Sequence, residues 1–274
     1  MKKGRKIGFV GAGNMGEALI SGLIKAKFVS SGQLWVFDSD REKLQWIQKK
    51  YGVKKATDNN QIASQCNPVL LCVKPQSMKE VIEEMAESLD ASKLLISIAA
   101  GVPLYVIEAY ARKQLRLVRV MPNIAVLVQE GASAIAPGNL TSEEDIRLTQ
   151  SIFNCVGKSI LLPESLMDAV TGLSGSGPAY VFLVVEALTD AGVHLGMTRT
   201  QAFTLASQTV KGAVKLLLET GEHPALLRER VTSPGGTTAA GLYKLEEGGF
   251  KKTLIEAVIA ATQRSKELGE KMKQ

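Results

Sequence analysis

Cysteine and histidine are scarce in this 274-residue chain, which contains three cysteines and two histidines. Cys66, Cys72 and Cys155 are odd in number and lack metal-binding or redox spacing, so we expect reduced, buried thiols in a cytoplasmic protein and no metal site. His194 falls near the end of an expected helix and His223 precedes Pro224. We therefore predict a capping or surface role for each histidine rather than general-base catalysis.

Long apolar runs and clustered basic residues are also lacking. The most apolar later run, Tyr180 to Leu188, contains Glu186 and is too short to span a bilayer. The basic residues before Ile7 resemble the start of a signal peptide, but a glycine turn interrupts the apolar run and no small-residue cleavage site follows. The formal charge of +6 is scattered in ones and twos, without the basic stripe of a nucleic-acid binder. We expect neither a membrane nor a nucleic acid as partner.

A glycine-rich turn joins an expected strand, Ile7 to Val10, to an expected helix that begins at Asn14. Its three glycines, Gly11, Gly13 and Gly16, have the G-x-G-x-x-G spacing of dinucleotide-binding proteins. In that motif the first glycine permits the turn, the second lets a pyrophosphate approach the backbone, and the third lets the helix pack closely on the strand. The helix N-terminus favours the phosphates. The turn therefore predicts a nucleotide site.

The first 163 residues alternate strands and helices. Strands are expected at Ile7–Val10, Leu34–Phe37, Gly52–Ala56, Pro68–Val73, Lys93–Ile98, Leu115–Val120 and Lys158–Leu162, with helices at Arg41–Lys50, Asn59–Gln65, Met78–Leu89, Leu104–Ala111 and Ser142–Phe153. This alternation predicts an α/β fold with a Rossmann-type, doubly wound parallel sheet. The ligand of such a sheet lies at the carboxyl ends of the strands.

From residue 164 onward only helices are expected. They run from a start at Ser176–Pro178 to Leu195, and then over Thr198–Thr220, His223–Val231, Thr237–Glu247 and Phe250–Met272. Apolar residues such as Phe182 and Leu183 occupy much of the circumference of these helices, so we expect the helices to be buried against a partner subunit. The predicted domains are a dinucleotide-binding domain, 1–163, and an all-helical dimerisation and substrate domain, 164–274.

Two polar positions follow expected strands of the first domain. Asp38 stands where a carboxylate bonds a ribose 2′-hydroxyl and favours NAD, whereas Ser39 and Arg41 suit the 2′-phosphate of NADP. Alternatively, Asp38 or Ser39 only caps the next helix. Lys74 precedes Pro75 at the end of a buried strand, where it contacts cofactor or a substrate carboxylate, or is simply a solvated lysine.

A second glycine-rich segment, Ser233–Thr238, leads into an expected helix. It lacks the Gly-Lys-Ser/Thr ending of a phosphate-binding P-loop. Bare glycine backbone and two threonine hydroxyls at a helix N-terminus suit a small carboxylate. Ordinary helix capping remains the alternative reading.

The chain resembles the pyrroline-5-carboxylate reductase family over essentially its full length. The matching segments are Gly11–Gly16, Val73–Pro75, Ala99–Gly101, Met121–Asn123, Leu173–Tyr180 and Ser233–Thr238, in family order and spacing. The resemblance implies reduction of pyrroline-5-carboxylate to L-proline, the last step of proline synthesis, by a homodimer that can assemble into decamers. Asp38 replaces the neutral residue of many NADP-preferring members, so the cofactor is NADPH or NADH.

The resemblance also implies the site residues. The cofactor-binding residues are Val10, Gly11, Ala12, Gly13, Asn14, Met15, Ser39, Asn59, Cys72, Val73, Lys74, Pro75, Ala99 and Ala100, to which the spacing adds Asp38. The substrate carboxylate and ring lie on Ser233, Pro234, Gly235, Gly236, Thr237 and Thr238. We assign the catalytic roles to Thr238 and Lys74.

Reduction of a cyclic imine agrees with the absence of a strong general acid. If the bound imine is already protonated, its positive charge activates it and positioning dominates, which alone contributes about 7–11 kcal/mol. Thr238 can donate or relay a hydrogen bond to the ring nitrogen without ionising. A hydroxyacid dehydrogenase of this architecture would need a lysine early in the first helix of the second domain, and Pro178–Leu183 contains none. A nucleotide-sensing protein would not need Ser233–Thr238.

Overall fold

The computed structural model describes residues 5–271 and contains two compact units. Among the described residues, the first unit comprises 5–176 and 260–271, and the second comprises 177–259. The division predicted from the sequence, 1–163 and 164–274, is a division by function and stays a prediction. Division into compact units places the boundary after Ser176 and assigns residues 260–271 to the first unit.

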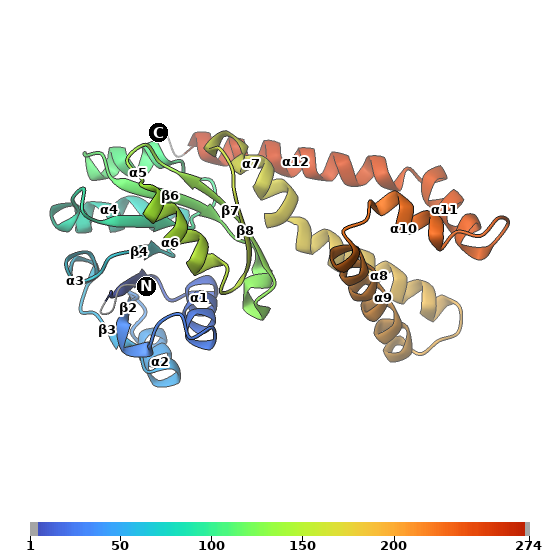
Figure 1. Ribbon diagram of the computed structural model, residues 1–274, viewed down its shortest axis with the longest axis horizontal. Helices are drawn as coiled ribbons and strands as arrows, with labels where there is room; N and C mark the ends of the chain where they lie inside the picture. Colours follow the sequence, from blue (N-terminus) through green and yellow to red (C-terminus); the bar gives the residue numbers. More distant parts are fainter. Residues whose placement is uncertain (1–4, 272–274) are drawn as a thin grey trace. The chain divides into compact units, whose positions relative to one another are not determined.

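An eight-stranded sheet forms the centre of the first unit (Figure 1). The strands are β1 (Ile7–Val10), β2 (Leu34–Phe37), β3 (Lys54–Lys55), β4 (Val69–Leu71), β5 (Leu94–Ser97), β6 (Arg116–Met121), β7 (Gly131–Pro137) and β8 (Gly157–Leu161). Their order is β3-β2-β1-β4-β5-β6-β7-β8, and all pairs are parallel except β6–β7. The chain leaves β1 toward one side and returns to β4 on the other, which makes the β1–β4 junction a topological switch point.

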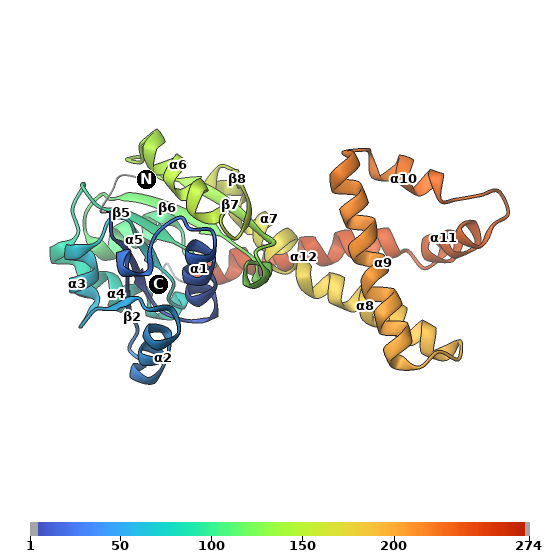
Figure 2. The ribbon, with the colours of Figure 1, turned by 60° about the horizontal axis from the view of Figure 1, so that its bottom comes forward.

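Helices cover both faces of this sheet (Figure 2). One face packs against α1 (Asn14–Lys25), α2 (Arg41–Tyr51) and α6 (Glu143–Phe153). The other packs against α3 (Asn59–Gln65), α4 (Met78–Met85) and α5 (Leu104–Ala111). Strand side chains alternate between the two cores, with Phe9 in the first and Val10 in the second, as the period of two requires. The structure confirms the predicted Rossmann-type class.

The structure departs from the expected elements in two places. The sequence analysis missed β7, which is the only antiparallel partner of β6 in the described residues. Its alanine-rich sequence has little intrinsic strand preference, so its place between β6 and β8 decides its conformation. A helix begins at Gly177 with Pro178 in its first turn, as predicted, but Ser176 closes the preceding helical segment instead of forming an isolated cap. α7 (Met167–Val170) continues through a π-helical turn, Thr171–Gly175, in which the Ser176 N–H donates to the Thr171 carbonyl at 2.8 Å.

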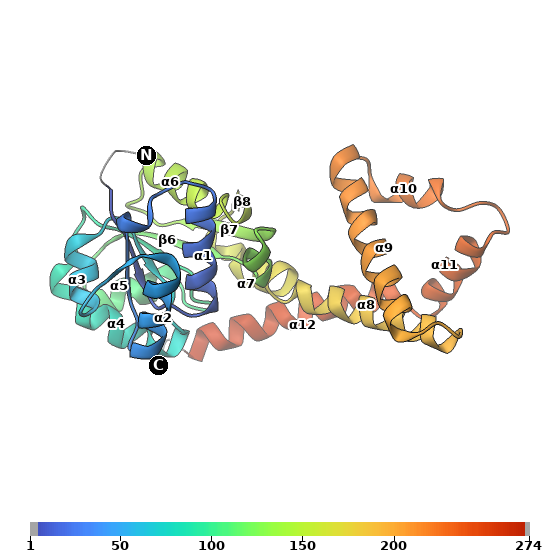
Figure 3. The ribbon, with the colours of Figure 1, turned by 90° about the horizontal axis from the view of Figure 1, so that it is seen from below.

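The second unit is helical throughout its regular structure (Figure 3). It contains α8 (Gly177–His194), α9 (Arg199–Thr220), α10 (Pro224–Arg230), α11 (Thr237–Glu247) and the start of α12 (Phe250–Lys271). α8 packs on α9, where a Cβ on Gly192 would lie 2.7 Å from the Ala202 Cβ. His223 caps α10 by accepting from the Ala225 N–H at 3.2 Å, as predicted. The expected end of the last helix, Met272, lies outside the described residues.

The three cysteines are free thiols. Cys66 is buried, whereas Cys72 and Cys155 are only partly buried, so the expectation of buried thiols is wrong for these two. Burial raises the pKa of Cys66 to about 11 and raises the pKa of Cys72 and Cys155 as well. Along residues 5–271, no helix has the length and apolar composition to cross a membrane.

Candidate functional site

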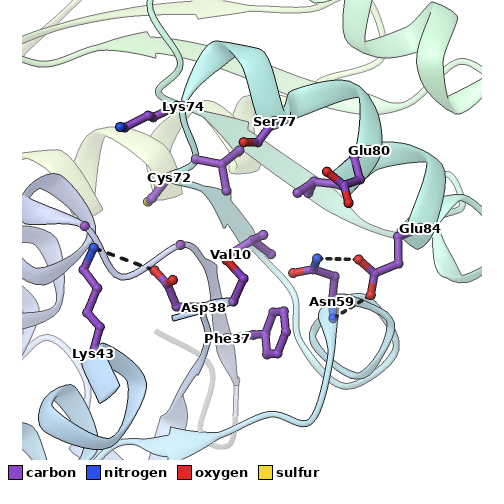
Figure 4. A pocket seen from close by; sticks show the side chains of 15 residues that line it. Val10, Phe37, Asp38, Lys43, Asn59, Cys72, Lys74, Ser77, Glu80 and Glu84 are labelled. Carbon is purple, nitrogen blue, oxygen red and sulfur yellow. Dashed lines mark hydrogen bonds and ion pairs between the residues drawn. The ribbon is translucent and has the colours of Figure 1, made fainter. Parts of the chain in front are cut away.

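A cleft of about 460 Å³ lies at the carboxyl ends of β1, β2 and β4, at the switch point of the sheet (Figure 4). Nine of the residues predicted to hold the cofactor line it: Val10, Gly11, Gly13, Asp38, Ser39, Asn59, Cys72, Val73 and Lys74. The position is the one that a doubly wound sheet offers to a nucleotide. The strands thus bring together residues that lie up to 64 positions apart in the chain (10 to 74).

The three glycines of the turn have different surroundings. Gly11 has φ +95°, and a Cβ there would lie 2.8 Å from the carbonyl oxygen of Cys72. A Cβ on Gly16 would lie 2.6 Å from the Gly11 carbonyl oxygen. Around Gly13, by contrast, the nearest atom to such a Cβ is the Lys43 Nζ at 3.7 Å. The described residues therefore leave space at Gly13, on the side where a pyrophosphate would approach.

The N-terminus of α1 is open to an anion. Gly13 is its N-cap residue and offers no side chain to the first N–H groups of the helix. These N–H groups and the helix dipole favour a negative charge. The thiol of Cys72 in the same cleft stays neutral at physiological pH because burial raises its pKa. The turn therefore fits a dinucleotide pyrophosphate.

Asp38 holds the glycine turn in place. Its Oδ2 accepts from the Ala12 N–H at 2.7 Å, and its Oδ1 accepts from the Asp40 N–H at 2.9 Å. The cap of α2 is Asp40, which accepts from the N–H groups of Glu42 and Lys43 at 3.1 Å each. The alternative that Asp38 or Ser39 caps this helix is therefore wrong. Each Asp38 oxygen keeps a second lone pair for a ribose hydroxyl.

Asn59 is buried at the other end of the cleft, with 5% of its surface exposed. Its Nδ2 donates to Glu84 Oε2 at 2.7 Å, and its main-chain N–H donates to Glu84 Oε1 at 3.3 Å. Its Oδ1 has no hydrogen-bond partner among the described residues. An unsatisfied buried acceptor costs about 1–3 kcal/mol, which a ligand donor can offset.

Lys74 lies on the rim of the cleft, exposed, and precedes the short 3₁₀ turn Pro75–Ser77 (Figure 4). Pro75 and Ala100 line a neighbouring cavity of about 320 Å³, which also includes Thr171, Ser176 and Arg264. Ala99, the neighbour of Ala100 in the chain, is buried. Ala12, Asn14 and Met15 belong to the turn and the first residues of α1.

In the second unit, the segment Ser233–Thr238 forms the start of α11. Gly235 has φ +67°, and the Gly236 N–H donates to the Ser233 carbonyl at 3.0 Å. Gly236 is the N-cap and supplies no side-chain bond, so the first N–H groups of α11 are not capped by a side chain. Thr237 and Thr238 are the first two helical residues, and Thr238 is partly buried. The carboxylate site on this segment stays a prediction, and the absence of a side-chain cap is compatible with it.

Known proteins match nearly the full length of the chain. A family model described as pyrroline-5-carboxylate reductase dimerisation matches residues 164–268, and one described as NADP oxidoreductase coenzyme F420-dependent matches residues 6–101. Pyrroline-5-carboxylate reductase of Methanosarcina acetivorans is 49% identical over 97% of this chain and 99% of its own length. The chain belongs to the pyrroline-5-carboxylate reductase family.

Solved structures of pyrroline-5-carboxylate reductases agree with this assignment. The enzyme of Coxiella burnetii superposes with a TM-score of 0.92 at 38% identity and covers 96% of this chain and 98% of its own. The enzyme of Plasmodium falciparum, whose structure has NADP bound, gives a TM-score of 0.87 at 34% identity, covering 97% and 99%. The predicted family, the fold class and the oxidoreductase class are confirmed.

The sequence analysis missed part of the cleft of this reductase. Lining residues that it did not identify are Phe37, Lys43, Ser77, Glu80, Val81 and Glu84. Four of them lie on or directly before α4 with a spacing of three or four residues, which places them on one helix face. That spacing was visible, but nothing in the sequence showed which face of α4 looks toward β4 and α3.

Proposed function

We propose that this protein reduces (S)-1-pyrroline-5-carboxylate to L-proline with NADPH or NADH, the last step of proline biosynthesis. The observation that carries the proposal is the relationship over 97% of the chain to a protein of that name. The cleft agrees with it, because Gly13 is open and the α1 N-terminus has no side-chain cap.

The nicotinamide cofactor supplies the hydride when it is bound, and the residues of this chain bind and orient the cofactor and the substrate. The main chain of Ser233–Thr237 receives the substrate carboxylate at the N-terminus of α11. The Thr238 hydroxyl hydrogen-bonds the ring nitrogen: it donates to the nitrogen of the neutral imine and accepts from the N–H of the iminium form. Lys74, a cation on the rim of the cofactor cleft, attracts the anionic cofactor and the substrate carboxylate.

The choice between the two cofactors depends on residues after β2. Asp38 favours a free ribose 2′-hydroxyl, since a carboxylate repels a 2′-phosphate. Ser39, Arg41 and Lys55 border a hollow beside it and supply one hydroxyl and two cations for that phosphate. We propose that both cofactors are used, with opposing contributions from these two groups.

The working assembly is a homodimer formed through the helical unit, and dimers associate further into decamers. The match of residues 164–268 to a dimerisation model and the exposed apolar helices support the dimer. The decamer rests on the family resemblance. Three free thiols support a cytoplasmic location.

Oxidation of NADPH and of NADH in the presence of pyrroline-5-carboxylate tests the proposal, with proline identified as product. Thr238→Ala should lower kcat and kcat/KM together by about ten- to a thousandfold with cofactor affinity nearly unchanged. Thr238→Ser keeps the hydroxyl and should retain much of the activity. Full turnover by Thr238→Ala with a lower melting temperature would leave Thr238 as a structural residue only.

A further inference from the structure

The side-chain amide of Asn59 has one end fixed by Glu84 and one end free. The carboxylate of Glu84 receives both the Nδ2 group and the main-chain N–H of Asn59, at 2.7 and 3.3 Å. Asn59 belongs to the first turn of α3 and Glu84 to the last turn of α4. Two bonds from one carboxylate therefore set the orientation of this amide.

The chemistry of the pair permits only one amide orientation. An ionised carboxylate accepts hydrogen bonds and donates none, so the NH₂ end of the amide must face Glu84. The oxygen consequently points away from Glu84, toward the middle of the cleft (Figure 4). That oxygen has no partner among the described residues, although Asn59 is buried.

A hydrogen-bond donor of the ligand must complete this acceptor. The ring of Phe37 lies beside Asn59 (Figure 4), and Val81 also lines the cleft, so both offer apolar surface to a flat purine. The phosphates belong at the α1 N-terminus and the ribose near Asp38, so the base of a dinucleotide is the part that extends to Asn59. Adenine carries an exocyclic amine, which is a donor, whereas hypoxanthine carries a carbonyl at the same position.

We propose that Glu84 is a positioning residue that holds the Asn59 oxygen ready to accept from the adenine amine. Through Asn59 it makes the cleft selective for adenine over purines with a carbonyl at that position. The inference rests on the proposed function, because it needs a dinucleotide in this cleft. The oxygen has almost no exposed surface in the free protein, so this contact requires the side chains that cover it to shift when the base binds.

Binding without substrate provides the test. The fluorescence of the reduced nicotinamide gives Kd for NADH and for reduced nicotinamide hypoxanthine dinucleotide, which differ only in the base. The parent protein should bind NADH at least about tenfold more tightly, since a site built for a donor rejects an analogue without one. In Glu84→Gln this ratio should fall to about one to three, because a glutamine amide can bond either end of the Asn59 amide.

Glu80 provides the matched control. It lies one helical turn before Glu84 and lines the same cleft, but it is not the residue that holds the Asn59 amide. Glu80→Gln removes the same charge and should leave the Kd ratio unchanged. An equal fall of the ratio in Glu80→Gln would overturn the positioning role, since charge alone would then explain the effect.

Exchanging donor and acceptor gives a rescue. In the double variant Asn59→Asp, Glu84→Gln, the introduced glutamine NH₂ donates to one oxygen of the introduced carboxylate, and the other oxygen of that carboxylate faces the cleft as an acceptor. The adenine preference should return to within about threefold of the parent ratio. Thermal melting confirms folding of each variant, and a folded double variant without adenine preference would overturn the proposal.

A double-mutant cycle separates positioning from direct contact. Asn59→Ala should abolish the preference, and Glu84→Gln in the Asn59→Ala background should change it no further. A second fall there would show that Glu84 contacts the base itself and would overturn the proposal. Equal affinity of the parent protein for both dinucleotides would overturn the positioning role of Glu84 while leaving the reductase function intact. If the parent protein bound neither dinucleotide, both the positioning role and the proposed reductase function would be overturned.

Discussion

The two units of this protein bury their side chains to very different extents. The first unit contains large residues with no exposed surface on both faces of its sheet, including Phe9, Phe153 and Met78. In the second unit, only Thr189, Ala202 and Ala206 are buried among residues 177–259. The first unit therefore has its own core, whereas the second presents a surface that requires cover.

The ion pairs of the two units also differ in burial: the example from the first unit is buried, and the example from the second is exposed. In the first unit, Arg116 donates from two nitrogens to Asp145, whose side chain is only 4% exposed, and so links β6 to α6. The ion pair Arg199–Asp190 of the second unit is exposed, with 69% and 56% of the two side chains accessible. Such exposed pairs contribute about 0–1 kcal/mol. Ion pairs of this kind do not replace the missing core of the second unit.

Assembly should show the largest effect of this difference. Leu183 is 65% exposed on α8, and we expect Leu183→Glu to abolish the dimer at micromolar concentration. Each subunit loses about 1.5–3 kcal/mol of apolar burial and places a carboxylate in the interface. Sedimentation velocity measures the assembly, and far-UV circular dichroism measures the helix content of each variant.

An exposed aromatic residue of the first unit is the control for that change. Trp46 on α2 is 47% exposed, and Trp46→Glu should leave the dimer intact. A dimer that survives Leu183→Glu, or one that dissociates equally in Trp46→Glu, would contradict the contrast between the units.

The glycine turn of the first unit should show the next largest effect. Gly11→Val places a side chain against the Cys72 carbonyl at φ +95° and should lower the free energy of unfolding by about 2–6 kcal/mol. Gly13→Val meets open space in the protein, so it should fold normally and lose cofactor binding. Chemical denaturation and cofactor titration measure the two effects. Normal cofactor affinity in folded Gly13→Val would contradict the assignment of the pyrophosphate to this turn.

Much of the first unit could be predicted from the sequence because its local patterns are unambiguous. Buried parallel strands such as β4 and β5 are continuous apolar runs, and the glycine turn has a fixed spacing. β7 could not be predicted, since its alanines form a strand only between β6 and β8. The π-helical turn before Ser176 likewise depends on the preceding α7.

The candidate site shows the same limit. The positions of Gly13 and Lys74 followed from motifs that are local in sequence. The bonds between Asn59 and Glu84 join α3 to α4, and the bond between Asp38 and Ala12 joins two strand ends. Such pairs, 25 and 26 residues apart, depend on strand order and helix packing, which spacing alone does not specify.

The contribution of the buried Arg116–Asp145 ion pair to stability should depend on pH. Burial by itself would raise the pKa of Asp145, but the bonds from Arg116 and Ser142 lower it below its ordinary value. Its stabilisation is therefore complete above the unfolded-state pKa of about 3.9 and is lost as pH falls through the lower folded-state pKa. Asp145→Asn should cost about 3 kcal/mol at pH 7, and this difference from the parent should shrink below pH 4.

Urea unfolding at several pH values measures the effect. Glu143 on the same helix is the control, since its pair with Arg147 is 85% and 67% exposed, and Glu143→Gln should cost less than about 1 kcal/mol. If the two variants cost the same at pH 7, the distinction between buried and exposed pairs does not hold for this helix.

Cofactor choice should show the smallest effect. Asp38→Ser removes the carboxylate that opposes a 2′-phosphate and should shift the NADPH to NADH ratio of kcat/KM about tenfold toward NADPH, which corresponds to about 1.4 kcal/mol. The Ala12 N–H also loses its acceptor, so both cofactors should bind less tightly, and only the ratio reports on the charge. Asp40→Ser makes the same charge change two residues later and retains a capping side chain for α2, so its ratio should stay at the parent value. An equal shift in both variants would indicate a general charge effect after β2.

A constant ratio in Asp38→Ser would contradict the role of this carboxylate in cofactor choice. Asp38 would then only hold the glycine turn, and discrimination between NADPH and NADH would depend on Ser39, Arg41 and Lys55.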